Sequence, residues 1–323
     1  MRTHQRTHIR TSLIAATAIL GLVLSGCGSD AEDDSASEGD DGTAAAEATE
    51  EDGGDAGGGD CSTVVLGYIP SWTDGLSTAY LLDNMLTNAG YTVEHQEINE
   101  PGVLYTALAG GDVDIYPSAW PEVTHASYMD EYGDSIEDLG TYYDNAKLTM
   151  AVPEYVDITS IDELVDNADM FENRIVGIEA GAGLTEAVET GVIPTYGLDE
   201  AGFSLETSST TGMLAELDSA TQAEEPIVVT LWRPFWANAA YPVKDLEDPE
   251  GALGDAEGLH FLARTGFADD CPDVAAAVGE ISLDDSTYGA MEDTVVNEFE
   301  GEPAEGISAF LEEYPDAVPA VGS

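Results

Sequence analysis

Residues 227–231, with the sequence IVVTL, constrain the fold more than any other stretch of this chain. A continuous run of β-branched and aliphatic residues is typical of a strand buried on both faces, as in a parallel sheet covered by helices. Pro234 cannot take part in a sheet ladder, so we expect the strand to stop at Trp232. Ligands of open α/β sheets bind beyond the carboxyl ends of the strands, which makes Trp232 a candidate binding residue.

The first part of the folded region alternates strands with helices. We expect strands at residues 63–69, 91–98 and 112–116, and helices at residues 77–89 and 103–109. Glycines at positions 90, 110 and 111 supply stops for the two helices. The order strand, helix, strand, helix, strand predicts a mostly parallel sheet.

A second unit of the same kind begins near Met150. Ser160 and Glu163 have the spacing of a capping box at the start of a helix. The expected elements that follow are strands at 174–178, 203–207 and 227–231, helices from Leu184 and at 210–223, a strand near 260–263, and helices at 273–281, 286–299 and 303–313. We predict an α/β fold of two lobes around a cleft, with residues 61–150 and 246–323 in lobe I and residues 151–245 in lobe II.

The N-terminus has the features of an export signal. Arg2, Arg6 and Arg10 precede an apolar run over residues 11–24, which is short for a transmembrane helix. Leu24-Ser25-Gly26-Cys27 resembles a bacterial lipobox, in which Cys27 is lipidated and becomes the first residue of the mature protein. We expect a signal peptide at 1–26 and a lipid tether to the outer face of the cytoplasmic membrane. The alternative is an ordinary secretory signal.

Residues 28–60 consist mostly of Gly, Ala, Ser, Asp and Glu and contain no aromatic residue. Such a segment cannot bury enough apolar surface to fold, so we expect an acidic, flexible linker. The whole chain carries a formal net charge of −57, from 65 acidic and 8 basic residues. This balance excludes a phosphate-binding surface, argues against a nucleic-acid partner and suggests a salt-tolerant, halophilic host.

Cys61 and Cys271 remain in the folded part. Two cysteines in one extracellular domain usually pair, so we expect a disulfide between the first strand and a late element. The alternative is two free thiols.

The four tryptophans of the chain are candidates for a ligand cage. Trp72 and Trp120 follow predicted strands, as Trp232 does, and Trp232 and Trp236 each lie two residues from Pro234. Aromatic faces in a desolvated cleft attract a quaternary ammonium by about 0.5–2 kcal/mol each, and such a cation cannot donate a strong hydrogen bond. The alternative for each tryptophan is packing in the core.

Two further features would suit the ends of such a ligand. Asp74, two residues after Trp72, adds negative charge near the cation, unless it is only an acidic residue of a helix N-terminus. Gly181-Ala182-Gly183 at a helix start offers backbone N–H groups to an anion, unless it is only a tight turn. The chain has neither a dinucleotide fingerprint nor a phosphate-binding loop.

Taken together, these segments resemble the substrate-binding proteins of ABC-type glycine betaine, proline betaine and choline uptake systems. The matching segments are Gly67-Tyr68, Trp72-Thr73-Asp74, Gly90-Tyr91, 111–115 (GDVDI), Trp120-Pro121, 151–155 (AVPEY), 160–164 (SIDEL), 177–183 (GIEAGAG), 208–210 (SST), 213–217 (MLAEL), 232–236 (WRPFW) and 246–249 (LEDP). The resemblance covers residues 63–313.

The resemblance implies a type II periplasmic-binding-protein-like fold that closes over its ligand. It places Trp72, Trp120 and either Trp232 or Trp236 in an aromatic cage, with Asp74 near the cation as in choline-type members. It adds Tyr68, Tyr143, Phe235 and residues 181–183 as candidate ligand contacts. It also implies a quaternary ammonium solute, an ABC permease as membrane partner, a monomer, and no cofactor, metal or catalytic residue.

Two positions depart from the family pattern. Phe235 stands where the family usually has a histidine that helps to hold a ligand carboxylate. Leu148 stands where an aromatic residue often follows Ala-Lys, and Tyr142 or Tyr143 is a candidate substitute. The sequence therefore does not choose between betaine-like and choline-like solutes.

Three alternatives stay open at this stage. A secreted hydrolase needs a nucleophile with a base, a metal cluster or paired carboxylates, and His95, His125 and His260 have no spacing suited to a metal. A different osmolyte, such as ectoine or proline, is a second alternative. A purely structural surface lipoprotein without a ligand is the third.

Overall fold

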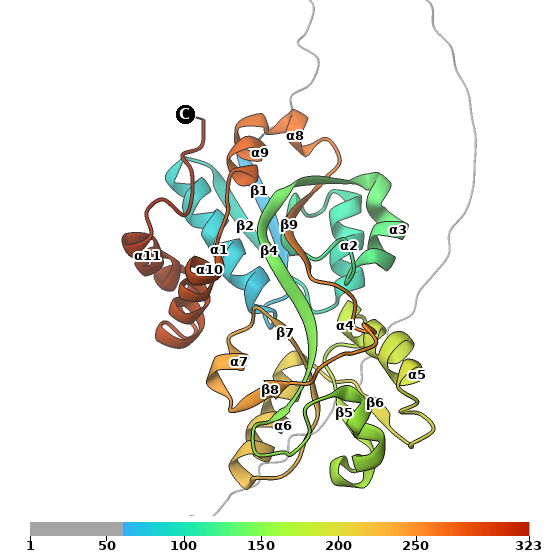
Figure 1. Ribbon diagram of the computed structural model, residues 1–323. Coiled ribbons are helices and arrows are strands. Elements are labelled where there is room, and N and C mark those ends of the chain that lie inside the picture. The colour runs from blue at the N-terminus through green and yellow to red at the C-terminus, as the bar shows by residue number, and fades with distance from the viewer. Residues whose placement is uncertain (1–60, 323) are drawn as a thin grey trace, which may run out of the picture. The chain divides into compact units, whose positions relative to one another are not determined.

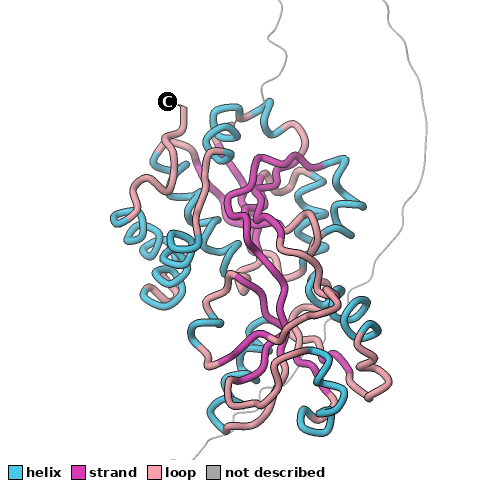
Figure 2. The backbone as a smooth tube through the Cα atoms, viewed as in Figure 1, coloured by secondary structure: helices cyan, strands magenta, loops and turns pink. Residues whose placement is uncertain are grey.

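The computed structural model describes residues 61–322, and the predicted signal peptide, Cys27 and the acidic linker lie outside these residues. Nine strands form one continuous mixed sheet (Figures 1 and 2). The strands are β1 (Thr63–Tyr68), β2 (Thr92–Glu97), β3 (Ile115–Ala119), β4 (Ile136–Pro153), β5 (Arg174–Val176), β6 (Ser204–Glu206), β7 (Val229–Arg233), β8 (Val243–Asp245) and β9 (Glu257–Arg264).

Helices flank the sheet. The α-helices are α1 (Thr73–Asn88), α2 (Pro101–Gly110), α3 (Ala126–Tyr132), α4 (Gly183–Glu186), α5 (Ile193–Thr195), α6 (Thr210–Ala223), α7 (Ala237–Ala240), α8 (Phe267–Asp270), α9 (Pro272–Gly279), α10 (Asp285–Glu292) and α11 (Pro303–Glu313). The 3₁₀ helices are η1 (Gly133–Ser135) and η2 (Ile161–Phe171), and the π-helices are η3 (Ala187–Val192) and η4 (Asp293–Glu298). No helix within residues 61–322 is long and apolar enough to cross a membrane.

The strand order β2-β1-β3-β9-β4-β7-β5-β6 divides the sheet into two lobes that share β4. In the first lobe β2, β1 and β3 are parallel, and β9 runs antiparallel to β3 and to the first part of β4. In the second lobe β6, β5 and β7 are parallel, and β7 and β8 run antiparallel to the last part of β4. The two-lobed α/β fold is confirmed, whereas the residue limits of 150 and 245 stay a prediction.

The long strand β4 is the main element that the sequence did not predict. It pairs with β9 from Ile136 to Ala146 and with β7 from Lys147 to Ala151. Three register shifts interrupt its pairing with β9, so its side chains do not alternate with a clear period of two. Gly140 has a φ of 138°, and a Cβ there would lie 3.4 Å from the backbone of Gly279. These irregularities hide the strand from a periodicity argument.

Local chemistry accounts for where several helices begin and end. Pro101 starts α2, because the first helical position needs no N–H, and Gly111 ends it with a left-handed φ of 79°. Ser209 caps α6 by accepting a hydrogen bond from Gly212 N at 3.0 Å. Helices α6 and α11 have the predicted limits, whereas α1 begins four residues earlier than expected.

The predicted capping box does not form. The hydroxyl of Ser160 donates to the carbonyl of Glu247 at 3.2 Å, and the carboxylate of Glu163 accepts from Thr159 N at 3.0 Å. The segment that follows is the 3₁₀ helix η2 with Asn167 in a non-helical conformation, so this prediction of an ordinary capped helix was wrong.

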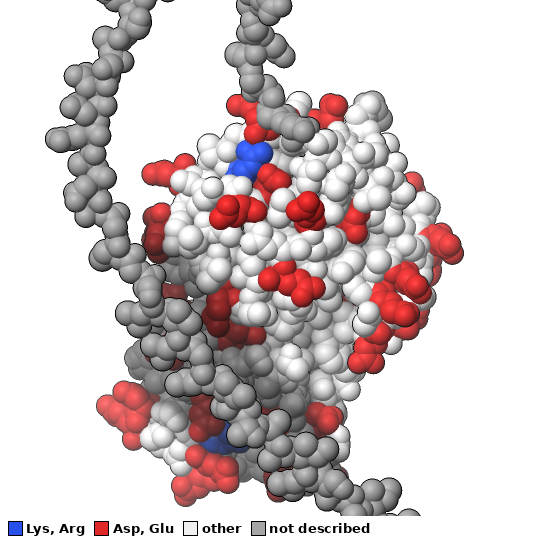
Figure 3. All heavy atoms as spheres, turned by 180° about the vertical axis from the view of Figure 1, so that it is seen from behind, with Lys and Arg blue, Asp and Glu red and all other residues white. Residues whose placement is uncertain are grey.

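Acidic side chains are spread over the face shown in Figure 3, and few basic ones interrupt them. In the described part Arg174 pairs with Glu206 and Glu216, Arg233 with Asp245, and Arg264 with Asp114 and Asp270.

The predicted disulfide is confirmed. Cys61 and Cys271 are bonded, with their Cα atoms 5.4 Å apart and a sequence separation of 210. Cys61 lies two residues before β1 and Cys271 directly precedes α9, so the bond fixes the start of the first lobe to a late helix.

Replacing both cysteines with serine is expected to destabilise the protein. A loop of this length restricts the unfolded chain, and the loop-entropy relation gives about 5 kcal/mol as the upper value of the loss. Urea unfolding of the wild type and of the Cys61→Ser/Cys271→Ser variant measures it. Equal unfolding midpoints in the two proteins would contradict the expectation.

Candidate ligand-binding site

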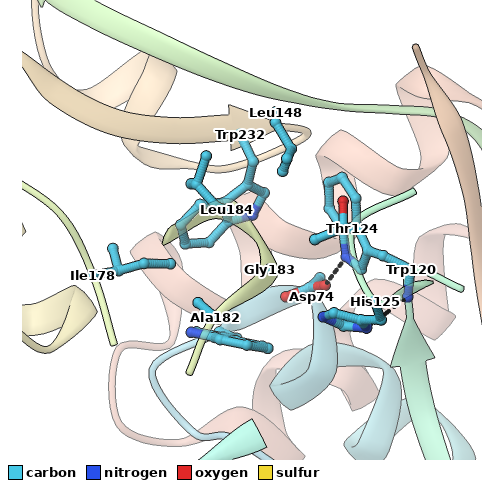
Figure 4. Close-up of a pocket in the computed structure, with 11 residues that line it drawn as sticks. Asp74, Trp120, Thr124, His125, Leu148, Ile178, Ala182, Gly183, Leu184 and Trp232 are labelled. Atoms are coloured by element: carbon cyan, nitrogen blue, oxygen red, sulfur yellow. Dashed lines mark hydrogen bonds between the residues drawn. The ribbon is translucent and has the colours of Figure 1, made fainter. Parts of the chain in front are cut away.

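An apolar cavity lies where the two lobes meet (Figure 4). Its walls are Trp72, Asp74, Trp120, Thr124, His125, Leu148, Ile178, Ala182, Gly183, Leu184 and Trp232. About 30 Å³ of it is open to the centre of a water-sized sphere. Enlarged by the ~1.4 Å radius of water, a rounded region of that size is roughly 6–7 Å across. A small methylated ammonium group has similar dimensions.

Three tryptophans from three different elements meet in this cavity. Trp72 immediately precedes α1 and Trp120 immediately follows β3, so both lie beyond strand ends as expected. Trp232 lies inside β7, opposite Leu148 of β4, and the expectation that the strand ends at residue 231 was wrong. The ladder continues by two residues because β4, which the sequence did not predict, supplies the partner strand.

Asp74 contributes a carboxyl group to the cavity from the first turn of α1. Its Oδ2 accepts hydrogen bonds from Ser118 Oγ at 2.7 Å and from Trp120 Nε1 at 3.2 Å. The side chain is 3 % exposed, and burial raises the pKa of this carboxyl. Asp74 thus fixes the orientation of Trp120 and places a titratable group beside the rings.

His125 supports two of the tryptophans, a role that the sequence did not indicate. Its ring stacks on Trp72 with centroids 6.1 Å apart and an angle of 16° between the planes. Its Nδ1 accepts from Trp120 N at 3.1 Å and lies 2.9 Å from the hydroxyl of Tyr105. Burial lowers the pKa of His125 to about 3, so at neutral pH the ring is uncharged and its proton is on Nε2.

Gly183 brings the second lobe into close contact with the first. A Cβ at this position would lie 1.8 Å from the carbonyl oxygen of Thr124. Only glycine therefore allows the start of α4 to approach the loop after β3 as closely as it does.

Only part of the predicted glycine turn lines the cavity. Ala182 and Gly183 line the cavity, while the carbonyl of Gly181 accepts a hydrogen bond from Tyr128 at 2.7 Å outside it. Whether this turn binds an anion stays a prediction.

Four other predicted contacts do not line this cavity. Tyr68 packs against Tyr80 and His95, with its hydroxyl 3.2 Å from His95 Nδ1. Tyr143, Phe235 and Trp236 line a separate groove of about 620 Å³. Phe235 also stacks on Trp232 at 3.9 Å between centroids, so it forms part of the wall between the cavity and the groove.

Neither tyrosine replaces the family's missing aromatic residue in the cavity wall. Tyr142 shares a hydrogen bond with Ser118 Oγ at 2.7 Å, and Tyr143 donates to Asp285 at 2.9 Å. Leu148 itself lines the cavity. Thr124, His125, Ile178 and Leu184 are wall residues that the sequence did not indicate, because single residues of these types carry no motif.

Comparison with known proteins identifies relatives. The family model described as the substrate-binding domain of ABC-type glycine betaine transport systems matches residues 62–313. The glycine betaine/carnitine transport binding protein GbuC of Listeria monocytogenes is 32% identical over 158 residues, which cover 49% of this chain and 51% of that protein. The chain thus matches about half the length of this relative.

Two solved structures are similar over nearly their whole length. The glycine betaine/L-proline-binding protein ProX of Borrelia burgdorferi is 30% identical with a TM-score of 0.73, covering 80% of this chain and 97% of that one. Lactococcal OpuAC, solved closed with glycine betaine, is 27% identical with a TM-score of 0.72, covering 79% and 97%.

A second buried carboxyl belongs to the lining of the separate groove and is close enough to Asp74 to interact with its charge. Glu292 of α10 is 3 % exposed and accepts hydrogen bonds from Thr73 Oγ1 at 2.6 Å and from Tyr288 at 3.4 Å. Burial is the main cause that raises its pKa to about 8, and the nearby Asp74 adds to the shift. At neutral pH the folded protein therefore keeps the proton of Glu292, whereas the unfolded chain releases it above the ordinary glutamate pKa of 4.5.

Between pH 5 and pH 8 the native state binds this proton and the unfolded chain does not. We therefore predict that the free energy of unfolding falls as the pH rises from 5 to 8. One such group lowers the free energy of unfolding by up to about 1.4 kcal/mol per pH unit. Glu292→Gln should remove much of this slope, because the amide stays neutral and still accepts from Thr73. Urea unfolding at pH 5 and pH 8 measures it, with the exposed Glu298→Gln as control. An equal fall in the free energy of unfolding from pH 5 to pH 8 in wild type and Glu292→Gln would contradict the prediction.

Proposed function

This chain belongs to the family of substrate-binding domains of ABC-type glycine betaine transport systems, and we propose that it captures a quaternary ammonium solute for such an importer. The solute would bind in the cavity between the lobes, and lobe closure would complete the walls around it. The protein would then deliver the solute unchanged to a permease in the membrane.

The observation that carries this proposal is the composition of the cavity wall. Three indole side chains and one carboxyl group surround a space of ammonium size, and the wall contains neither Lys nor Arg. A methylated ammonium has no N–H to donate, so aromatic faces and a carboxylate are its natural partners. Several faces together, with exclusion of water, approach the roughly 8 kcal/mol that micromolar affinity requires.

The groups near the cage favour a solute with net positive charge, such as choline. A cation in the cavity would oppose the burial effect on Asp74 and favour its ionised form. A zwitterion brings a carboxylate as well, and no cationic side chain of the wall would receive it. We propose that His125 Nε2, which makes no hydrogen bond within the described residues, donates to an oxygen of the solute.

The remaining features of the proposal concern location. We propose that Cys27 carries the lipid that holds the protein at the outer face of the cytoplasmic membrane, and that residues 28–60 act as a spacer. We propose that the protein acts as a monomer and catalyses no reaction, since its relatives are solute-binding proteins.

A thermal-shift panel on residues 61–323 tests the proposed function. A ligand at 100 times its Kd adds about 2.7 kcal/mol of stability, so choline should raise the melting temperature clearly. Glycine betaine, proline betaine, carnitine, ectoine and proline complete the panel. A shift with betaine would indicate that the backbone at residues 182–183 holds a carboxylate. A folded sample that responds to no quaternary ammonium would contradict the function.

Trp232→Ala is expected to weaken binding of the solute that responds in the panel by at least tenfold, because one cation–π contact is worth up to about 2 kcal/mol. Trp236→Ala is the matched control, since Trp236 lies in the separate groove. The affinity of this variant for the solute should stay within about threefold of wild type. Calorimetry measures both variants. The reverse order of effects would assign the third cage position to Trp236.

Gly183→Ala is expected to weaken binding by more than tenfold, because the added methyl group would overlap Thr124 O and hold the lobes apart. Gly110→Ala is the control, since a Cβ there meets nothing within 4 Å. Calorimetry gives the affinities, and circular dichroism verifies that both variants are folded. Unchanged affinity in Gly183→Ala would show that binding does not need this contact.

A further inference from the structure

Glu179, in the loop between β5 and α4, carries a buried carboxylate that contacts both lobes. The side chain is 7 % exposed. From the first lobe it accepts hydrogen bonds from Ser71 Oγ at 3.3 Å and Trp72 Nε1 at 3.1 Å. From the second lobe it accepts from Thr210 N and Thr210 Oγ1, both at 2.9 Å. Each carboxylate oxygen thus receives one donor from each lobe.

The carboxylate of Glu179 therefore lies at the interface of the lobes. Four donors satisfy the carboxylate, and no Lys or Arg of the described residues forms an ion pair with it. A buried carboxylate without a cationic partner is stable only while its hydrogen bonds are made. Separation of the lobes would remove the two donors of the first lobe.

The hydrogen bond from Trp72 also acts on the cage. An N–H group that donates to an anion moves electron density toward its ring, which makes the ring face more negative and more attractive to a cation. The same pairing occurs a second time, because Trp120 Nε1 donates to Asp74. Two of the three indoles in the cavity wall are therefore bonded to buried carboxyl groups.

We propose that Glu179 is a positioning residue that couples lobe closure to the strength of the cage. In the closed arrangement it holds Trp72 in place across the interface and increases the attraction of that ring for a cation. This inference rests on the proposed function for its ligand but not for its hydrogen bonds. The simpler alternative is that Glu179 only caps the start of α6 through Thr210, which would involve the second lobe alone.

Two ligands separate the electrostatic role from a purely structural one. Choline and 3,3-dimethyl-1-butanol have nearly the same shape, but carbon replaces the charged nitrogen in the second. Glu179→Gln keeps the size of the side chain and removes its charge. We expect choline affinity to fall about tenfold and the affinity for the uncharged analogue to change less than threefold. Glu163→Gln is the control, because this half-buried glutamate accepts its hydrogen bonds from Thr159 within the second lobe.

A ligand-free measurement tests the contact between the lobes. Hydrogen exchange of the indole N–H groups is followed by NMR, with Trp120 as internal reference because its own bond goes to Asp74. Glu179→Ala should speed exchange at Trp72 at least tenfold relative to Trp120.

The outcomes distinguish the two proposals. Equal losses for both ligands in Glu179→Gln would overturn the electrostatic role, and unchanged exchange at Trp72 in Glu179→Ala would overturn the coupling. If wild type binds neither choline nor any other quaternary ammonium, the proposed function fails, and the exchange experiment still decides whether Glu179 ties the lobes together.

Discussion

Hydrogen bonds from indole N–H groups to buried carboxyl groups hold two of the three tryptophans that line the cavity between the lobes. Trp120 is held by Asp74 within the first lobe, and Trp72 is held by Glu179 across the interface. A tryptophan without a partner for its N–H in a buried wall would lose a hydrogen bond to water without compensation. The carboxyl groups remove this cost and bring negative charge close to the rings. The polarity of the site therefore follows from the need to bury its aromatic residues.

The sequence predicted the parallel parts of both lobes because their strands are short and alternate with helices. Strand β7 was expected from its β-branched residues, and α6 and α11 from their spacing and end residues. Strand β4 was not expected, although it joins the lobes. Acidic and glycine positions and three register shifts disrupt its pattern, and its partners β7, β8 and β9 all come later in the chain. Its stability comes from tertiary pairing, which local propensity does not encode.

The candidate site was predictable where it depends on strand ends and not where it depends on side-chain contacts. Trp72, Asp74, Trp120 and Trp232 were expected near one another because each lies at or beside the end of a strand, and all four line the cavity. His125 and Glu179 were not expected. Glu179 and Trp72 are 107 residues apart, and only the packing of the two lobes brings them together. A single buried histidine or glutamate has no sequence pattern that separates this role from ordinary packing.

The acidic surface and the cage act over different distances, and this difference bears on function in salty media. The net charge of −57 attracts cations at long range, but salt screens such attraction over about 10 Å at 0.1 M and about 3 Å at 1 M. Contacts inside the cavity are shorter than this and lie in a region from which water and ions are excluded, so salt weakens them far less. The proposed cation–π cage, backed by buried carboxyl groups, would therefore keep its affinity at ionic strengths where the surface charge no longer attracts a ligand. The proposed capture of a solute at high salt would therefore depend on the buried rings and not on the surface charges.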